Sequence, residues 1–482
     1  MLNRSHPCCL ALASFVIFCA VQWFPMAFAS EKGFRAGAYA QDITPDQFPI
    51  SVNGGMQDRL AHGVHDRLHA RCLVLDDGQT KLAFAVCDSC MIPREIMDEA
   101  KRLASEQTGI PVTNMLISAT HTHTAPTVAG AFQSEANVQY AKALPKLIAK
   151  GITEAHARLQ PARIGWAVGK DPTQVFNRRW KMEPGTISPD PFGRNTDRVK
   201  MNPGYQAKGL IEPAGPIDPD VSILAVQTRD GKPLALLANY SLHYVGGVSP
   251  LSADYFGAFA DRIAQLLEAP KEFVGIMSNG TSGDVNNINF AGPPPARQRE
   301  FEQCKIVANS VAQAALEAYR RIEFKDHVPL AVAERDITLG VRRPTAEEVA
   351  QAKEILAQAK GPVLQTLPEV YARETVLLAE YPPSVPVKLQ AMRVGDLGIA
   401  AIPCEVFAEI GLELKKRSPL QPMFTISLAN GYNGYLPTPE QHKLGGYETW
   451  RARSSYLEVD ASTKITATIL ELLNEVAMKG RN

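Results

Sequence analysis

The chain has 482 residues, and its 50 lysines and arginines balance its 50 aspartates and glutamates. This balance gives no support for nucleic acid or an anionic membrane surface as the partner. The length is sufficient for a large buried core, organised as one large enzyme domain or as two lobes.

The first 29 residues are typical of a secretory signal peptide. Arg4 supplies a positive start, Leu10 to Val21 forms an apolar run, and Ala27-Phe28-Ala29 is an A-x-A cleavage signature. Polar and proline residues interrupt the run, which makes a retained membrane anchor the less favoured alternative. We therefore predict a mature catalytic domain of residues 30–482 that is secreted or periplasmic and has no integral membrane segment.

Alternating strand and helix patterns in the mature chain predict an α/β fold, with mixed sheets flanked by helices and the active site at strand ends. The expected strands are 34–43, 67–75, 81–87, the apolar run from 114, 162–168, 221–228, 234–242, 272–277, two within 385–402, and 424–429. The expected helices are 93–106, 136–157, 256–267, 299–320, 345–360, 367–380, 406–416 and 461–477. We expect 345–360 and 367–380 to form an exposed pair, and 171–219 to be an irregular segment that covers the active site.

The cysteines do not form a disulfide framework. The mature chain keeps Cys72, Cys87, Cys90, Cys304 and Cys404. Cys87 and Cys90 make a C-x-x-C motif, but a structural zinc site needs a second pair, which the sequence lacks. Buried thiols are the favoured interpretation, and a Cys87–Cys90 disulfide is the alternative.

The most informative stretch runs from Asn114 to Pro126 and contains His121-Thr122-His123 after a short apolar run. In an extended backbone, positions i and i+2 point to the same side. We therefore expect His121 and His123 to project together from the end of a core strand, as a metal ligand and a second catalytic group. The alternative is a pair of polar residues in a strand-end loop.

Three other apolar strands are also followed by polar residues. His243 follows 234–242, Glu405 follows 398–403, and Tyr435 lies in the loop after 424–429. In α/β sheets, ligands bind beyond the strand ends. With one histidine of the His-Thr-His motif, these nitrogen and oxygen donors suit a borderline metal such as zinc. Sequence spacing does not decide whether they converge.

These motifs resemble the neutral/alkaline non-lysosomal ceramidase family in its N-terminal catalytic domain. Residues 117–126, ISATHTHTAP, are similar to the family's S-A-T-H-T-H-S-G-P signature, and the segments 176–179, 239–243, 402–405 and 430–435 follow in the family's order. The resemblance covers almost the whole mature chain. It implies an amidohydrolase that cleaves the C–N amide bond of a ceramide-like N-acyl lipid, with a water molecule activated by zinc.

The resemblance also implies which residues form the site. One zinc ion per chain would be held by His121, His243, Glu405 and Tyr435. Substrate and transition-state contacts would fall on His123, Arg178 and Tyr447. The histidine would move protons, the arginine would fix a polar group, and the tyrosine would donate to the oxyanion. Each has a structural alternative: a strand-end histidine, a helix N-terminal acid, a solvated loop charge or a half-buried aromatic.

The sequence departs from the family pattern in three ways. Asn286 stands where the family has an active-site serine, and Tyr244 stands where it has a proline. We also expect no C-terminal immunoglobulin-like domain. A carboxamide is not an oxygen nucleophile, so Asn286 is compatible with an activated water but not with a serine nucleophile. Two rival functions stay open: a hydrolase of another amide or ester on this scaffold, and a secreted binding protein without turnover.

Several residues carry weaker signals. They are His62, His65, His69, Asp254, Asp284, Asn286 and His442. We expect Asn286, His65 and Asp284 to contact substrate, with His442 as an outside candidate, and the two aspartates to orient ligands. The spacing of His62, His65 and His69 resembles a second metal cluster, but a loop with solvated histidines before strand 67–75 is the simpler interpretation.

Overall fold

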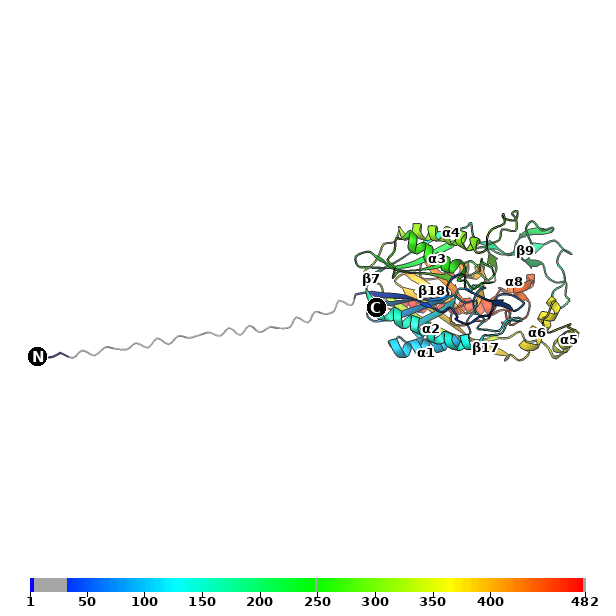
Figure 1. Ribbon diagram of the computed structural model, residues 1–482, viewed down its shortest axis with the longest axis horizontal. Helices are drawn as coiled ribbons and strands as arrows, with labels where there is room; N and C mark the ends of the chain where they lie inside the picture. Colours follow the sequence, from blue (N-terminus) through cyan, green and yellow to red (C-terminus); the bar gives the residue numbers. More distant parts are fainter. Residues whose placement is uncertain (4–32, 248, 480–482) are drawn as a thin grey trace. The chain divides into compact units, whose positions relative to one another are not determined.

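The computed structural model describes residues 1–3, 33–247 and 249–479, and its largest element is an eight-stranded mixed sheet (Figure 1). In spatial order its strands are β14 (Val274–Asn279), β13 (Pro233–Tyr240), β12 (Asp220–Thr228), β7 (Gln160–Lys170), β1 (Arg35–Asp42), β4 (His69–Asp76), β5 (Lys81–Cys87) and β6 (Met115–Ala119). Most neighbours are antiparallel, but β5 with β6 and β13 with β14 are parallel. Residues 4–29 of the predicted signal peptide lie outside the described residues, so the signal stays a prediction.

A second, four-stranded sheet packs against the first. Its strands, in order, are β16 (Leu330–Gly340), β17 (Ser384–Val394), β18 (Leu397–Ile402) and β20 (Met423–Ser427), with β18 and β20 parallel. Alternate residues of each strand point to opposite faces. Leu73 and Phe84 of the large sheet therefore share one buried core with Phe424 of the small sheet.

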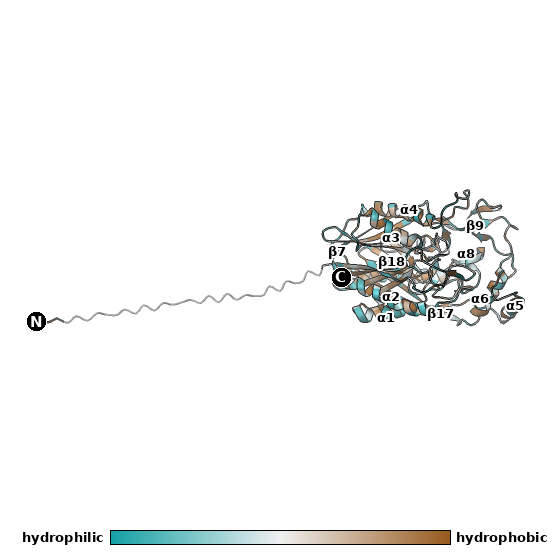
Figure 2. Cartoon of the chain, viewed as in Figure 1, coloured by the Kyte–Doolittle hydropathy of each residue, from teal (hydrophilic) through white to brown (hydrophobic). Residues whose placement is uncertain are grey.

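Helices cover the outer faces of both sheets, which gives a helix–sheet–sheet–helix arrangement. Over the large sheet lie α1 (Arg94–Thr108), α2 (Val138–Ala157), α3 (Asp254–Leu266) and α4 (Glu302–Tyr319), and over the small sheet lie α7 (Ala408–Arg417) and α9 (Ala461–Met478). The helices carry both hydrophilic and hydrophobic residues, as amphipathic helices do (Figure 2). The predicted α/β class with mixed sheets flanked by helices is confirmed.

Two local predictions need correction. The predicted exposed pair corresponds to α5 (Ala346–Ala357) and α6 (Leu367–Leu378), but α6 buries Val370, Tyr371 and Leu378. The predicted irregular segment 171–219 contains β8 (Phe176–Asn177), β9 (Arg179–Met182), β10 (Val199–Met201) and β11 (Leu210–Pro213). The last three form a small sheet, and β8 pairs with β15 (Val285–Asn286). Strands this short are hidden in sequence by their turn-forming neighbours.

Short elements complete the fold around the strand ends. These are β2 (Ile50–Val52), β3 (Arg59–Ala61), β19 (Glu405–Val406), β21 (Tyr435–Leu436), α8 (Pro439–Leu444) and the 3-10 turns η1 (Val112–Asn114) and η2 (Tyr447–Thr449). All five cysteines of the mature chain are buried free thiols, which confirms the favoured interpretation. Within the described ranges, every helix is too short or too polar to cross a bilayer.

Candidate metal centre

The carboxyl ends of three parallel strand pairs meet at one place. His121 follows β6, His243 follows β13, and Glu405 follows β18. Strand β20 lies between the two ends of the large sheet: Leu428 O, just beyond β20, accepts a hydrogen bond from Ala119 N at 3.1 Å, while Thr425 O accepts one from Asn239 Nδ2 at 3.1 Å. Residues far apart in the sheet order are thereby brought together.

The His-Thr-His motif reaches this place by a turn, not by a strand. The expected extended backbone is wrong, because β6 ends at Ala119 and His121 has a φ of 75°. The turn is held by hydrogen bonds from Thr120 N to Cys87 O and from His121 N to Ser89 O, both 2.9 Å. The two rings still meet: His121 Nε2 and His123 Nε2 lie 3.3 Å apart.

The donor atoms have the spacing of ligands around a small cation. His121 Nε2 lies 3.1 Å from His243 Nε2 and 3.1 Å from Glu405 Oε2, and the latter two atoms lie 4.0 Å apart. Each of these three residues is at most 3% exposed. Ligands at about 2.0–2.1 Å from a tetrahedral zinc ion are separated from one another by roughly 3.3 Å. The spacing and the mixed N/O chemistry of the residues present therefore fit zinc.

Backbone carbonyls orient two of the imidazoles. His121 Nδ1 donates to Cys90 O at 2.7 Å, and His243 Nδ1 donates to Ser282 O at 3.0 Å. A proton on Nδ1 leaves the Nε2 lone pair as the available donor. The two Nε2 atoms face each other, an arrangement that needs a proton or a metal cation between them.

The ionisation of the cluster also suits a cation. Burial, followed by the charge of Arg178, lowers the pKa of His243, and burial followed by His121 lowers the pKa of His123. Burial alone would raise the pKa of Glu405, but His121 and Arg178 lower it overall. The site thus contains a carboxylate and two neutral imidazoles, those of His123 and His243, at neutral pH. Burial alone would lower the pKa of His121, yet Glu405 raises it, so a proton competes with a metal for that nitrogen.

Glu405 holds an oxygen that the described residues leave without a hydrogen-bond donor. Its Oε2 is buried and lies 3.1 Å from His121 Nε2 but accepts no well-aligned hydrogen bond, whereas Oε1 accepts one from Tyr432 OH at 3.0 Å. A buried carboxylate oxygen without a donor is costly unless a cation binds it. Tyr432 was not singled out in the sequence, although it lies in the same Asn-Gly-Tyr-Asn-Gly-Tyr motif as Tyr435.

Tyr435, Tyr447 and Arg178 surround this cluster. Tyr435 is paired directly with Glu405 between β21 and β19, and its hydroxyl accepts a hydrogen bond from Arg178 Nη2 at 3.1 Å. Arg178 Nη1 lies 3.3 Å from His243 Nε2, and the Tyr447 ring packs edge-on against Tyr435 with centroids 5.7 Å apart. The seven residues that the sequence predicts for the site, four as metal ligands and three as catalytic residues, therefore lie in one buried neighbourhood.

Glu448 is a further residue that the sequence did not reveal. It is fully buried, and its two oxygens accept from Arg178 Nε at 2.9 Å and from Arg179 Nη1 at 2.6 Å. One carboxylate therefore fixes both arginines of the 176–179 segment. Its position beside Tyr447 in the sequence was the available signal.

The weaker candidates lie mostly outside this neighbourhood. Asp284 is buried next to Arg178, whose backbone N donates to Asp284 O at 2.9 Å, and its carboxylate accepts from Asn177 Nδ2 and from Ala408 N at the start of α7, each at 2.8 Å. Burial raises its pKa to about 6. His65 stacks on Phe301 with centroids 4.1 Å apart. Among the described residues, His62, His65 and His69 do not come close enough to one another to hold a metal.

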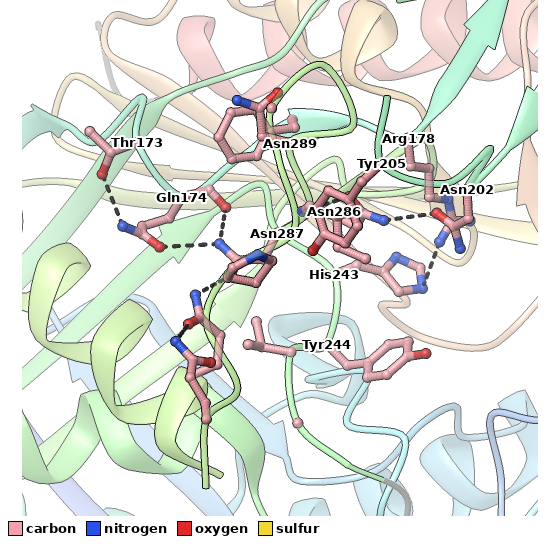
Figure 3. A pocket seen from close by; sticks show the side chains of 18 of the residues that line it. Thr173, Gln174, Arg178, Asn202, Tyr205, His243, Tyr244, Asn286, Asn287 and Asn289 are labelled. Atoms are coloured by element: carbon pink, nitrogen blue, oxygen red, sulfur yellow. Dashed lines mark hydrogen bonds between the residues drawn. The ribbon is translucent and has the colours of Figure 1, made fainter. Parts of the chain in front are cut away.

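Asp254, His442 and Asn286 have three different positions. Asp254 accepts hydrogen bonds from Val245 N and Gly246 N and so shapes the loop after His243. His442 lies in α8 and lines a separate cavity. Asn286 lines a cavity of about 590 Å³ whose walls also include Arg178 and His243 (Figure 3). This cavity gives a ligand access to the cluster.

The fold and the donor set define an α/β protein with a candidate N/O metal centre at strand ends. Residues 34–321 match the N-terminal region of the neutral/alkaline non-lysosomal ceramidases. The chain belongs to this family, which confirms the resemblance noted in the sequence.

Relatives support the same family. Neutral ceramidase B of Dictyostelium discoideum is 24% identical over 228 residues, which are 45% of this chain and 29% of that protein. The neutral ceramidase of Pseudomonas aeruginosa is 21% identical over 507 aligned positions, covering 91% of this chain and 72% of that one. The crystal structure of the Pseudomonas aeruginosa enzyme matches with a TM-score of 0.69 at 17% identity, covering 92% of this chain and 74% of that chain, so the two share a fold. The chain matches less than a third of the Dictyostelium protein's length.

Proposed function

We propose that this protein is an exported zinc-dependent amidohydrolase of neutral-ceramidase type that cleaves the C–N bond of an N-acyl substrate. The observation that most strongly supports this proposal is the convergence of His121, His243 and Glu405, whose donor atoms all lie within 4.8 Å of one another. Family membership and the names of the relatives support the reaction class. The products would be a carboxylate and an amine.

His121, His243, Glu405 and Tyr435 would hold the metal. Zinc supplies a Lewis acid that polarises a carbonyl and lowers the pKa of a coordinated water to about 7. The chain's own residues would do the rest. His123 Nε2, 3.3 Å from His121 Nε2, would accept the proton of the attacking water and return it to the leaving nitrogen.

Arg178 and Tyr447 would act on the substrate oxygen. Arg178 keeps a permanent positive charge in a buried setting, where charge stabilisation is strong. Its guanidinium is fixed on three sides by Glu448, Gly283 O and Tyr435 OH, so little reorganisation is needed when negative charge develops. The hydroxyl of Tyr447 would donate a hydrogen bond to the same oxygen.

Amide hydrolysis by purified mature protein tests this proposal. We expect release of carboxylate from N-acyl substrates, loss of release after chelation, and its return when zinc is added back. His123→Ala should keep the metal and lose turnover by about 10²–10⁴-fold, because it removes a general acid–base group. A protein that binds N-acyl compounds tightly with zinc present but forms no product would favour the binding-protein alternative.

A further inference from the structure

The cavity next to the candidate metal centre has walls of an unusual kind. Seven of its lining side chains are carboxamides, and six of these are hydrogen-bonded to one another as a group of four and a separate pair: Gln174, Asn287, Gln298 and Gln303, and Asn202 with Asn286. They come from three separate parts of the chain, the 171–219 segment, the loop after β14 and the start of α4 (Figure 3). The lining is therefore assembled by the fold and is not a local sequence bias.

Four of these amides form a continuous chain. Gln298 Nε2 donates to Gln303 Oε1 at 2.8 Å, and Gln303 Nε2 donates to Asn287 Oδ1 at 2.5 Å. Asn287 Nδ2 in turn donates to Gln174 Oε1 at 3.1 Å. Each carboxamide has two N–H donors and an oxygen with two lone pairs, so the links of the chain use only part of this capacity. The remaining donors and acceptors are held in fixed directions.

The other two carboxamides, Asn286 and Asn202, lie beside the candidate metal centre. Asn286 Nδ2 donates to Asn202 Oδ1 at 2.9 Å, and Asn286 is only 7% exposed. Asn286 is also held through its own oxygen, which accepts from Ile288 N at 2.9 Å. A substrate whose amide reached Arg178 and His243 would place the group on one side of that amide against this pair.

The cavity carries little charge and has an aromatic side chain on one wall. Of its lining residues in the described part of the chain, Arg178 alone carries a permanent charge. Tyr205 is 36% exposed, and its ring is supported by Phe290 with centroids 5.9 Å apart. Neutral donors and acceptors around an aromatic face match a ring that has hydroxyl groups at its edge and C–H groups on its face.

A long alkyl chain lying along the carboxamides would displace their water without replacing its hydrogen bonds. Polar groups that lose water to an apolar ligand must find other hydrogen-bond partners or destabilise the complex. We propose that the amine side of the scissile amide is an uncharged, hydroxyl-rich group, a sugar or a related polyol, and not a long-chain base. This inference rests on the proposed amide hydrolysis and names its substrate class.

The test compares two substrates that share one acyl group. Acetate release is measured from the methyl glycoside of 2-acetamido-2-deoxyglucose and from N-acetylsphingosine, with N-acetyl alkylamines of increasing chain length in parallel. We expect kcat/KM to be at least tenfold higher for the sugar amide and not to rise with chain length. An apolar site would instead raise it by about fourfold for each methylene buried.

Variants connect the preference to the cavity. Asn287→Leu and Gln174→Leu should each lower kcat/KM for the sugar amide by about tenfold, mainly through KM, while unchanged circular dichroism and zinc content show that each variant is folded. Gln365→Leu is the matched control, because this exposed carboxamide before α6 does not line the cavity. It should behave as wild type.

The outcomes separate this inference from the proposed function. Faster hydrolysis of N-acetylsphingosine, with rates for the N-acetyl alkylamines that rise with chain length and do not change in Asn287→Leu, would overturn the sugar assignment and leave amide hydrolysis standing. If neither substrate is hydrolysed by zinc-loaded protein, the proposed function fails. Calorimetry then tests whether the cavity binds the sugar amide. Binding that Asn287→Leu abolishes would support the cavity assignment, and absence of binding would overturn it.

Discussion

His121 and His243 follow strands at nearly opposite ends of one eight-stranded sheet, yet their Nε2 atoms lie 3.1 Å apart. The two histidines come this close because β20 of the second sheet lies against both ends of the large sheet. The candidate metal centre is therefore a property of the packing of two sheets. It depends on groups that orient the ligands as much as on the ligands themselves, and the first predictions concern those groups.

Tyr432→Phe removes a single hydroxyl from the candidate metal centre. That hydroxyl donates to Glu405 Oε1 at 3.0 Å and holds the carboxylate in place. We expect zinc affinity to fall by about 10–100-fold, measured by competition with a chromophoric chelator. Tyr456→Phe is the matched control, because its hydroxyl contacts Asn433 Nδ2 and not Glu405. Equal affinity in wild type and Tyr432→Phe would show that Glu405 needs no such support.

Glu448→Gln removes the negative charge that two buried arginines share. Because Arg178 and Arg179 would keep their charges with a weaker partner, we expect the free energy of unfolding to drop by about 3 kcal/mol in urea denaturation. The looser Arg178 should also lower kcat by at least tenfold.

Glu374→Gln is the control that separates these two effects. Glu374 is equally buried and pairs with Arg453 at 2.7 Å, but it lies outside the candidate metal centre. It should lose a similar amount of stability and keep its kcat. A matching loss of kcat in both variants would mean that Glu448 acts on stability alone.

Lys101→Met tests a buried charge behind the candidate centre. Lys101 is 2% exposed and donates to Asn430 Oδ1 at 2.8 Å. Burial lowers its pKa from 10.5 to about 8 in the folded protein. Between these two values the unfolded chain holds a proton that the folded chain has released, so the free energy of unfolding rises with pH.

The slope contributed by Lys101 is up to about 1.4 kcal/mol per pH unit between pH 8 and pH 10.5. Below pH 8 the lysine is charged in both states and its burial cost is fully present. We expect urea denaturation of wild type at several pH values in this window to show the rise, and Lys101→Met to lack it. A slope that survives the substitution would assign the titration to another group.

The sequence predicts well those features that depend on periodicity and on strand ends. Most strands and helices are within two or three residues of their predicted bounds, and the polar residues after apolar strands identify the neighbourhood of His243 and Glu405. Strand β16 was missed because Glu334-Arg335-Asp336 in its middle interrupts the apolar pattern on a largely solvent-facing stretch. Edge strands often carry such charged residues.

Features that depend on three-dimensional packing could not be predicted from the sequence. The turn at His121 is set by hydrogen bonds to the Cys87–Ser89 segment, and these partners lie more than thirty residues away in the chain. Tyr432 and Glu448 have no sequence signal of their own, because each acts by contacting a residue that is remote in sequence. The carboxylate of Asp284 accepts from Ala408 N at the start of α7, a contact that its position in the sequence does not predict.

The metal content of the purified mature protein tests the central claim most directly. Elemental analysis should find about one zinc per chain in wild type and in His62→Ala, an exposed-loop control. His121→Ala and Glu405→Ala should lose it, with unchanged circular dichroism showing that they remain folded. Wild type without a bound divalent metal after zinc loading, or His121→Ala that retains a full equivalent, would contradict the account.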